Sequence, residues 1–317
     1  MLDVLQTVAG LVLLVFGADL LVKGASSLAS RYGLSPLMIG LTVVSFGTSM
    51  PEMLVSVTAG LQGSADLAVA NVLGSNMFNI LVVLGVAAMI FPLRVQSSTV
   101  VSEIPFSLSA AILLGFVANA ALFTTKLELS ISRVDGAILL LFFLLFMAYI
   151  FSISSAGNKD NSQVPAAFTV TRSIALIFAG MAGLYFGGEW AVGGAVALAR
   201  DWGVDEAVIG LTIIAIGTSL PELMASAVAA YRREADIAVG NVVGSNIFNI
   251  LWVLGVTASI TALPFDAVSN FDIIMVIVAT MLIILAVATS RVATISRLWG
   301  GVFVCVYIAY IVYVVQR

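Results

Sequence analysis

The chain alternates long apolar runs with short polar breaks. The runs reach about the 20 residues that an α-helix needs to cross the hydrocarbon core of a bilayer. The alternation predicts an all-α integral membrane protein with ten transmembrane helices. We expect these helices at 4–28, 37–61, 68–90, 101–120, 134–153, 171–198, 207–230, 238–260, 270–289 and 297–315.

The longest connection, 154–170, is polar and contains a glycine and a proline. Such a composition is typical of a linker, and it divides the chain into two five-helix halves, 1–153 and 171–317. The other connections are short, so we expect no extramembrane domain. The N-terminal apolar run lacks the basic start of a cleavable signal peptide, so we expect it to remain as the first helix.

Two of the apolar runs in each half are interrupted by the same polar residues. The first half has GTSMPE at 47–52 and NVLGSNMFN at 71–79, and the second half has GTSLPE at 217–222 and NVVGSNIFN at 241–249. The offset is 170 residues for both motifs, and more than half of the positions around them are identical. A membrane protein that carries such polar segments twice is expected to build one site from two halves.

The odd number of helices in each half constrains the topology. Two homologous five-helix halves in one chain must enter the membrane from opposite sides, which makes them inverted-topology repeats. Most of the 13 lysines and arginines lie on the side reached after the odd-numbered helices. The positive-inside rule makes that side cytoplasmic, so we expect a multi-pass protein of the cell membrane with both termini outside.

Composition narrows the range of functions. Charged residues make up 9% of the chain and the net charge is −4, so a nucleic-acid partner is not expected. The absence of histidine excludes histidine-based zinc sites, proton relays and Ser–His catalysis, and the one cysteine, Cys305, lies in an apolar run. We expect neither an enzyme nor an organic cofactor. The lipid bilayer is the expected partner, and no obligate protein partner is implied.

Each duplicated motif places a carboxylate directly after a proline, Glu52 after Pro51 and Glu222 after Pro221. A proline inside a helix has no N–H and frees backbone carbonyl oxygens one turn earlier. A carboxylate at bilayer depth is costly unless it has a partner. With the hydroxyl and amide groups around them, these residues form an all-oxygen ligand set, which suits hard cations such as Ca²⁺ and Na⁺ rather than zinc or copper. Two glutamates would neutralise one divalent ion.

The third helix of each half carries three polar residues on one face, at i, i + 4 and i + 8. They are Asn71, Ser75 and Asn79 in the first half, and Asn241, Ser245 and Asn249 in the second. The first asparagine of each set could bind an ion or the backbone of a broken helix. Asn76 and Asn246 lie off this face and are expected to bond between helices.

Other interpretations of the polar residues remain open. Glycine, serine and threonine in transmembrane helices often serve only close helix packing, although two matching glutamates argue against packing as the sole role. Asp19 and Glu189 also match at the offset of 170 residues. They could lie on an ion path or form structural pairs, such as Asp19 with Lys23 one turn later.

The two motif pairs closely resemble those of the sodium/calcium exchanger family, in the cation/calcium antiporter superfamily, and above all its short prokaryotic members. The resemblance covers the full length. It implies exchange of Ca²⁺ for Na⁺ by alternating access, with ions bound mid-membrane among helices two, three, seven and eight and with helices one and six as a sliding gate. The implied ion ligands are Glu52 and Glu222 at the centre, Thr48, Ser49, Ser75, Thr218, Ser219 and Ser245 for Na⁺, backbone oxygens near Ser45 and Ala215, and Asn79 and Asn249 at the flanks.

One departure from the family pattern concerns Asn79 and Asn249, since many members carry aspartate at one of these two positions. K⁺-cotransporting relatives tend to carry acid at the second position, so K⁺ dependence is not favoured here. A Ca²⁺/H⁺ exchanger remains an alternative, because two glutamates could load protons instead of Na⁺. A cation channel is a rival from a different class, but inverted repeats favour alternating access over a continuous pore.

Overall fold

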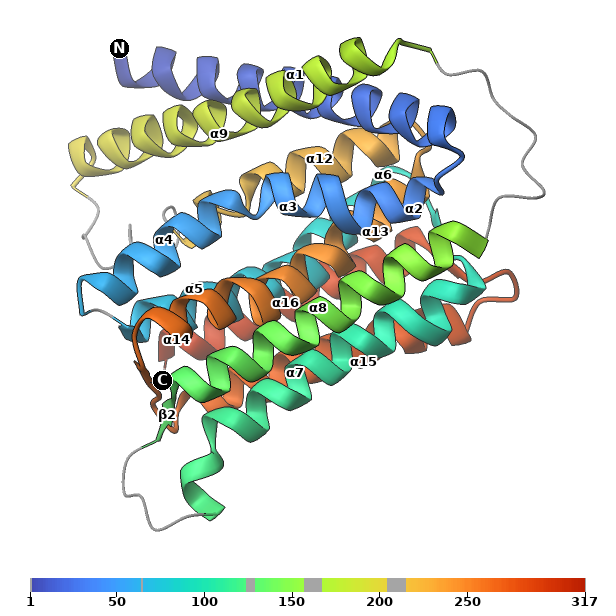
Figure 1. The fold of residues 1–317 in the computed structure, drawn as a ribbon. Coiled ribbons are helices and arrows are strands. Elements are labelled where there is room, and N and C mark those ends of the chain that lie inside the picture. The colour runs from blue at the N-terminus through green and yellow to red at the C-terminus, as the bar shows by residue number, and fades with distance from the viewer. Residues whose placement is uncertain (1, 64, 124–128, 157–166, 204–214, 317) are drawn as a thin grey trace.

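The structure is a computed structural model, and it describes residues 2–63, 65–123, 129–156, 167–203 and 215–316. These residues are almost entirely helical (Figure 1). The elements of the first half are α1 (Leu2–Tyr32), α2 (Pro36–Ile39), η1 (Gly40–Val44), α3 (Ser45–Thr48), α4 (Met50–Leu61), α5 (Ala65–Phe78), η2 (Asn79–Val83), α6 (Leu84–Ile90), β1 (Leu93–Arg94), η3 (Thr99–Glu103), α7 (Ile104–Ala118), η4 (Ala120–Phe123), β2 (Ser130–Ile131) and α8 (Arg133–Ala156).

The described elements of the second half follow a similar order. They are α9 (Val170–Asp201), α11 (Ala215–Gly217), α12 (Leu220–Tyr231), α13 (Ala235–Ile247), η6 (Phe248–Val253), α14 (Leu254–Ile260), β3 (Leu263–Pro264), α15 (Ser269–Ala288), β4 (Thr294–Ile295) and α16 (Arg297–Gln316). The segments η1, η2, η3 and η6 are π-helical turns, and η4 is a 3₁₀ turn. All four π turns continue directly into α-helices, and η1, η2 and η6 also follow directly on α-helices, so each of these three forms a local bulge within a longer helix.

Eight helices in the described part of the chain are long and apolar enough to cross a membrane. They are Leu2–Tyr32, Leu67–Ile90, Thr99–Ala118, Arg133–Ile153, Val170–Asp201, Ala235–Ile260, Ser269–Ala288 and Arg297–Val314. The pair Pro36–Thr48 and Met50–Leu61, bent by 46°, is a ninth if it is one span. Of the predicted span 207–230, residues 207–214 lie outside the described part, and the rest corresponds to α11 and α12.

The helices α1 and α9 form an antiparallel pair along one flank of the bundle (Figure 1). Glycines allow their backbones to touch. A Cβ added at Gly17 would lie 2.9 Å from the carbonyl oxygen of Gly180, and one added at Gly180 would lie 2.7 Å from that of Gly17. Gly10 meets Gly187 in the same way. This small-residue seam is typical of membrane helices, which associate through close packing rather than through burial from water.

The spans Leu67–Ile90 and Ala235–Ile260 form the centre of the bundle. Of their apolar windows, 72% and 94% are buried, against 28% for Leu2–Tyr32. Asn76 donates to the Asn246 carbonyl oxygen at 3.2 Å, and Asn246 donates to that of Asn76 at 3.4 Å. The prediction that these two asparagines bond between helices is therefore confirmed.

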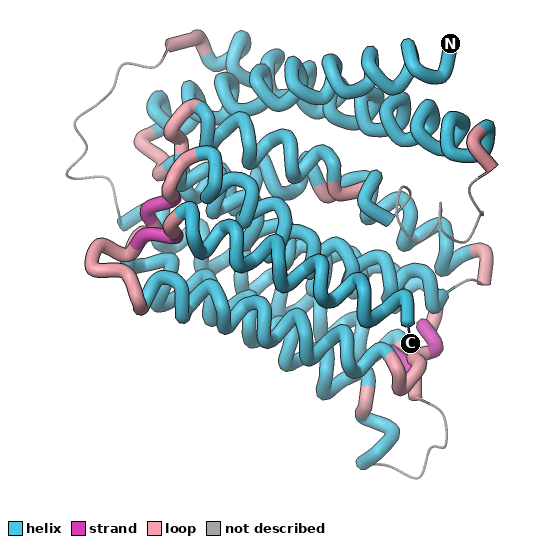
Figure 2. Tube along the Cα trace, turned by 180° about the vertical axis from the view of Figure 1, so that it is seen from behind, coloured by secondary structure: helices cyan, strands magenta, loops and turns pink. Residues whose placement is uncertain are grey.

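Two short antiparallel ladders join the halves at opposite ends of the bundle (Figure 2). In the first, β1 pairs with β4, with Leu93 opposite Ile295. In the second, β2 pairs with β3, with Ile131 opposite Leu263. Each ladder therefore ties a connection of one half to a connection of the other half.

Candidate cation site

The second predicted transmembrane helix, which spans α2 to α4, is broken at Ser49. α3 ends at Thr48 and α4 begins at Met50, and between them Ser49 has φ −82° and ψ 6°, outside the helical region. Pro51 and Glu52 then occupy the first turn of α4. Proline fits this position because the first N–H groups of a helix have no partner inside it. The N-terminus of α4 also carries a partial positive charge that stabilises the carboxylate.

The second half repeats this arrangement. α11 ends at Gly217, Ser219 has φ −92° and ψ 5°, and Pro221 and Glu222 lie in the first turn of α12. Both glutamate side chains are completely buried. No lysine or arginine among the described residues lies within salt-bridge distance of either carboxylate. The two acids therefore carry up to two negative charges in the interior without a basic partner, which is the costly arrangement unless a cation balances it.

Hydroxyl groups cross-link the two glutamates. Ser49 donates a hydrogen bond of 3.1 Å to Oε1 of Glu222, and Ser219 donates one of 3.1 Å to Oε1 of Glu52. Ser75 donates to the same Glu52 oxygen at 3.4 Å, and its Oγ lies 3.1 Å from that of Ser219. The serine of each half thus holds the carboxylate of the other half, and the two breaks meet at one place.

The second oxygens of both glutamates point into the protein without hydrogen-bond partners. Among the described residues, the buried side-chain oxygens that accept or donate no hydrogen bond here are Glu52 Oε2, Glu222 Oε2, Asn79 Oδ1, Asn249 Oδ1 and Thr218 Oγ1 at or beside the breaks, with Asn76 Oδ1, Asn246 Oδ1, Thr99 Oγ1, Glu103 Oε2 and Ser26 Oγ elsewhere. Buried polar atoms are normally satisfied, so such a group requires an explanation. Carboxylate, amide and hydroxyl oxygens are the ligands that hard cations prefer, and these residues fit such an ion.

An asparagine of α5 and one of α13 hold the two broken helices in place. Asn71 Nδ2 donates to the carbonyl oxygen of Glu52 at 3.3 Å and to Ser56 Oγ at 3.1 Å. Asn241 makes the same two bonds with Glu222 and Ser226, at 3.3 and 2.9 Å. Of the two roles considered for this asparagine pair, the structure supports binding to the backbone of the broken helices.

The remaining predicted site residues lie around this centre. Thr48 Oγ1 donates to Asn241 Oδ1 at 3.1 Å and lies 3.5 Å from Ser245 Oγ. Asn79 and Asn249 begin or lie within π turns, where the backbone N–H of Leu84 and of Leu254 bonds five residues back to their carbonyl oxygens. π turns of this kind often occur at functional sites. The side chains of Asn79 and Asn249 are buried and have no hydrogen-bond partner among the described residues.

The resemblance also implied backbone oxygens near Ser45 and Ala215 as ligands. The Ser45 oxygen accepts from Ser49 N at 3.0 Å, and the single proton of the Thr48 hydroxyl lies nearer to Asn241 Oδ1, at 3.1 Å, than to this oxygen, at 3.4 Å, so the Ser45 oxygen keeps a lone pair for an ion. Pro51 removes a backbone donor from the Gly47 carbonyl, one turn earlier, rather than from that of Ser45. In the second half Ser219 N donates to Ile216 at 3.1 Å rather than to Ala215.

Two features of the site were not predicted. Ser56 and Ser226 are completely buried and receive the asparagine bonds described above. They are identical residues at the offset of 170 residues, so a comparison of the two halves of the sequence could have identified them. Asp19 pairs with Lys23 at 2.6 Å, as one reading of the sequence proposed, but also with Arg232 at the end of α12, which the sequence did not indicate.

Comparison with known proteins identifies the family. The family model described as sodium/calcium exchanger protein matches residues 2–152 and 172–316. The inner membrane protein YrbG of Escherichia coli is 42% identical over 270 residues, which covers 80% of this chain and 78% of YrbG. The sodium/calcium exchanger MaX1 of Methanosarcina acetivorans is 31% identical, with 96% and 95% of the two chains covered.

A solved structure of the sodium-calcium exchanger NCX_Mj has the same fold, with a TM-score of 0.84, 31% identity and 98% of both chains covered. Its likeness extends over all the helices that position the two glutamates. The protein is a membrane transporter rather than an enzyme, in agreement with the expectation from its sequence. With the family model matched over nearly its whole length, the chain belongs to the sodium/calcium exchanger family.

Proposed function

We propose that the protein is a secondary antiporter of the cell membrane that exchanges Ca²⁺ for Na⁺ by alternating access. The observation that carries the proposal is the pair of buried glutamates, one from each half, with no basic partner among the described residues. The relatives of the protein, MaX1 and NCX_Mj, are named as sodium/calcium exchangers. A Ca²⁺ ion between Glu52 and Glu222 would cancel both charges, and no nucleotide or organic cofactor is required.

The neutral oxygens around the glutamates support Na⁺ as the second cargo. A monovalent ion needs fewer charges and can be held by hydroxyl and carbonyl oxygens. The proposed ligands of Ca²⁺ are Glu52 and Glu222. Those of Na⁺ add Thr48, Ser49, Ser75, Thr218, Ser219, Ser245 and backbone oxygens at Ser45 and Ala215, with Asn79 and Asn249 at the flanks. Because the two cargoes would share the glutamates, each would exclude the other, which is the requirement for exchange rather than joint transport.

Reciprocal contacts support two inverted five-helix repeats with ten transmembrane helices. Gly17 meets Gly180 and Gly10 meets Gly187, which are the same contact after exchange of repeat-related residues. The Ser49–Glu222 and Ser219–Glu52 bonds exchange in the same way. A two-fold axis generates such self-complementary pairs. Because α1 and α9 run antiparallel, the axis is perpendicular to the helices and lies in the membrane plane.

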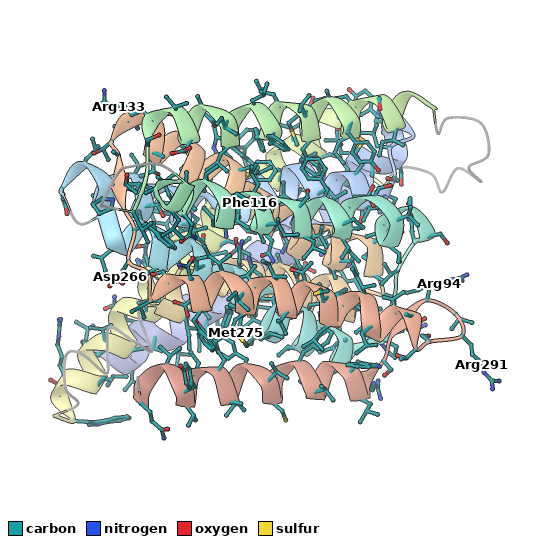
Figure 3. All side chains as sticks on the ribbon, turned by 90° about the horizontal axis from the view of Figure 1, so that it is seen from below. Arg94, Phe116, Arg133, Asp266, Met275 and Arg291 are labelled. Carbon is teal, nitrogen blue, oxygen red and sulfur yellow. The ribbon has the colours of Figure 1, made fainter. Side chains whose placement is uncertain are left out.

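Cysteine labelling tests this topology. On a Cys305→Ser background, Gln62→Cys and Arg233→Cys occupy exposed positions in the repeat-related turns after α4 and α12, where Gln62 itself corresponds to Arg232. We expect a membrane-impermeant maleimide to label Gln62→Cys from outside intact cells and Arg233→Cys only in inside-out vesicles. Figure 3 shows that Arg94 and Arg291 project from one end of the bundle and that Arg133 lies at the other. Labelling of both cysteines from the same side would contradict inverted repeats and the proposed orientation of the termini.

Ion gradients test the coupling. In proteoliposomes that hold the purified protein, an outward Na⁺ gradient should drive Ca²⁺ uptake against its own gradient, without K⁺. The reason is the neutral hydroxyl and amide surround, which adds no third carboxylate among the described residues to the two glutamates. Uptake that follows a pH gradient and ignores Na⁺ would identify a Ca²⁺/H⁺ exchanger instead. Uptake that needs K⁺ on the Ca²⁺ side would identify a K⁺-dependent exchanger, and uptake without any countergradient would favour a channel.

A further inference from the structure

A cavity of about 310 Å³ opens beside the cation site, between α9 and the two broken helices. Tyr185 and Glu189 of α9 line one side, and Pro51 and Thr218 line the other. Thr218 belongs to the break between α11 and α12, and its Oγ1 is one of the buried oxygens without a partner. The cavity therefore extends from Glu189 to the edge of the site that holds Glu52 and Glu222.

The repeat-related position at the other end of the bundle is occupied by ion-paired side chains. There the counterpart of Glu189 is Asp19, which pairs with Lys23 at 2.6 Å and with Arg232. The Arg232 contact joins the end of α12 to α1, and the two helices pack closely. The repeat-related pair is α9 with α4, and by contrast these two helices make hardly any backbone contact. Thr48 is completely buried, whereas its counterpart Thr218 is partly exposed.

The residues that neutralise Asp19 have no basic counterparts around Glu189. The position equivalent to Lys23 is Gly193, and the position equivalent to Arg232 is Gln62. Glu189 is exposed and has no ion pair among the described residues. It lies well inside the 32-residue helix α9, at a depth where an unpaired carboxylate facing lipid is costly. The cavity removes this cost if it is filled with water.

We propose that Glu189 is a capture site for the transported cations, Ca²⁺ and Na⁺, in a water-filled access passage that serves one side of the membrane only. The proposal rests on the proposed exchange function. A single carboxylate in a cavity with apolar walls concentrates cations, because the low dielectric of the walls focuses its field. Captured ions then have a short path past Thr218 to the two buried glutamates. At the opposite end Asp19 cannot take this role, because Lys23 and Arg232 already neutralise it.

The test compares Ca²⁺ presented to each face separately, in right-side-out and inside-out vesicles at low ionic strength. Glu189→Gln should raise the KM for Ca²⁺ by up to about tenfold at one face and leave it unchanged at the other, with the rate at saturating Ca²⁺ preserved. Glu189→Asp should restore most of the wild-type KM. The difference should shrink near about 0.15 M salt, where charges farther apart than about 8 Å are screened.

Glu234→Gln is the matched control, because it removes one carboxylate beyond the other end of α12 and does not line this cavity. It should leave the KM unchanged at both faces. A KM that Glu189→Gln leaves unchanged at both faces, or raises equally at both, would overturn the proposal. If the wild-type protein shows no Na⁺-driven Ca²⁺ flux, the proposed function fails instead.

A transport-independent measurement addresses the passage directly. On the Cys305→Ser background, Glu189→Cys should react with a charged methanethiosulfonate reagent from one face only. Reaction from neither face, or from both, would show that residue 189 does not line a one-sided aqueous passage.

Discussion

Glu52→Gln and Glu222→Gln should each abolish Na⁺-driven Ca²⁺ uptake while the protein remains folded in the membrane. Glutamine keeps the shape of the side chain and one carbonyl oxygen, but it removes half of the charge that faces the ion. Loss of one partner from a desolvated charge pair costs about 3–5 kcal/mol, which is at least a hundredfold in ion affinity. The fold should tolerate the change, since a neutral amide is less costly to bury than a carboxylate without a partner.

The measurement is Ca²⁺ uptake by proteoliposomes under an outward Na⁺ gradient, with size-exclusion chromatography as the check on folding. Glu103→Gln is the matched control, because Glu103 is also buried but lies outside the site, where its Oε1 accepts from the Tyr149 hydroxyl at 2.8 Å. We expect near-normal uptake for that variant. The double variant of Glu52 and Glu222 should be no worse than either single one, as one loss already disables the site. Near-normal flux in either single variant would rule out the two-carboxylate site.

Gly244→Ala should reduce Ca²⁺ flux about tenfold or more, although residue 244 offers no ligand. An added Cβ would lie 2.8 Å from the carbonyl oxygen of Leu41 and would also meet Ser45 Oγ. The π turn η1 and α3 would have to move away from α13, which would break the bond of 3.1 Å between Thr48 and Asn241. Overpacking of this kind costs about 1–3 kcal/mol, and about 1.4 kcal/mol corresponds to tenfold in an equilibrium constant.

Flux and thermal stability in detergent are the two measurements for this variant. Both should fall for Gly244→Ala. The control is Gly301→Ala on α16, where an added Cβ has no described atom within 4 Å. Since alanine favours helix over glycine, Gly301→Ala should retain flux and stability. Wild-type flux in Gly244→Ala would show that the contact between η1 and α13 does not position the site.

Much of the fold and of the site follows from local patterns in the sequence. The length of the apolar runs predicted the eight uninterrupted spans, because a helix must satisfy its own backbone hydrogen bonds inside a bilayer. The prolines predicted the breaks before Glu52 and Glu222, since a missing N–H acts on the residues next to it. The duplicated motifs predicted which polar residues gather, and Asn76 and Asn246 bond between helices as expected.

Only the tertiary structure decided which residue meets which. Ser49 holds Glu222 rather than its own neighbour Glu52, and Arg232 reaches Asp19 across 213 positions of the chain. The Ser45 carbonyl accepts from Ser49 N, so this backbone bond persists up to the break. Helix periodicity specifies the face on which a residue lies, but not the height or angle at which two helices cross. Those depend on glycine contacts between distant segments, such as Gly17 with Gly180, where the backbones approach until they touch.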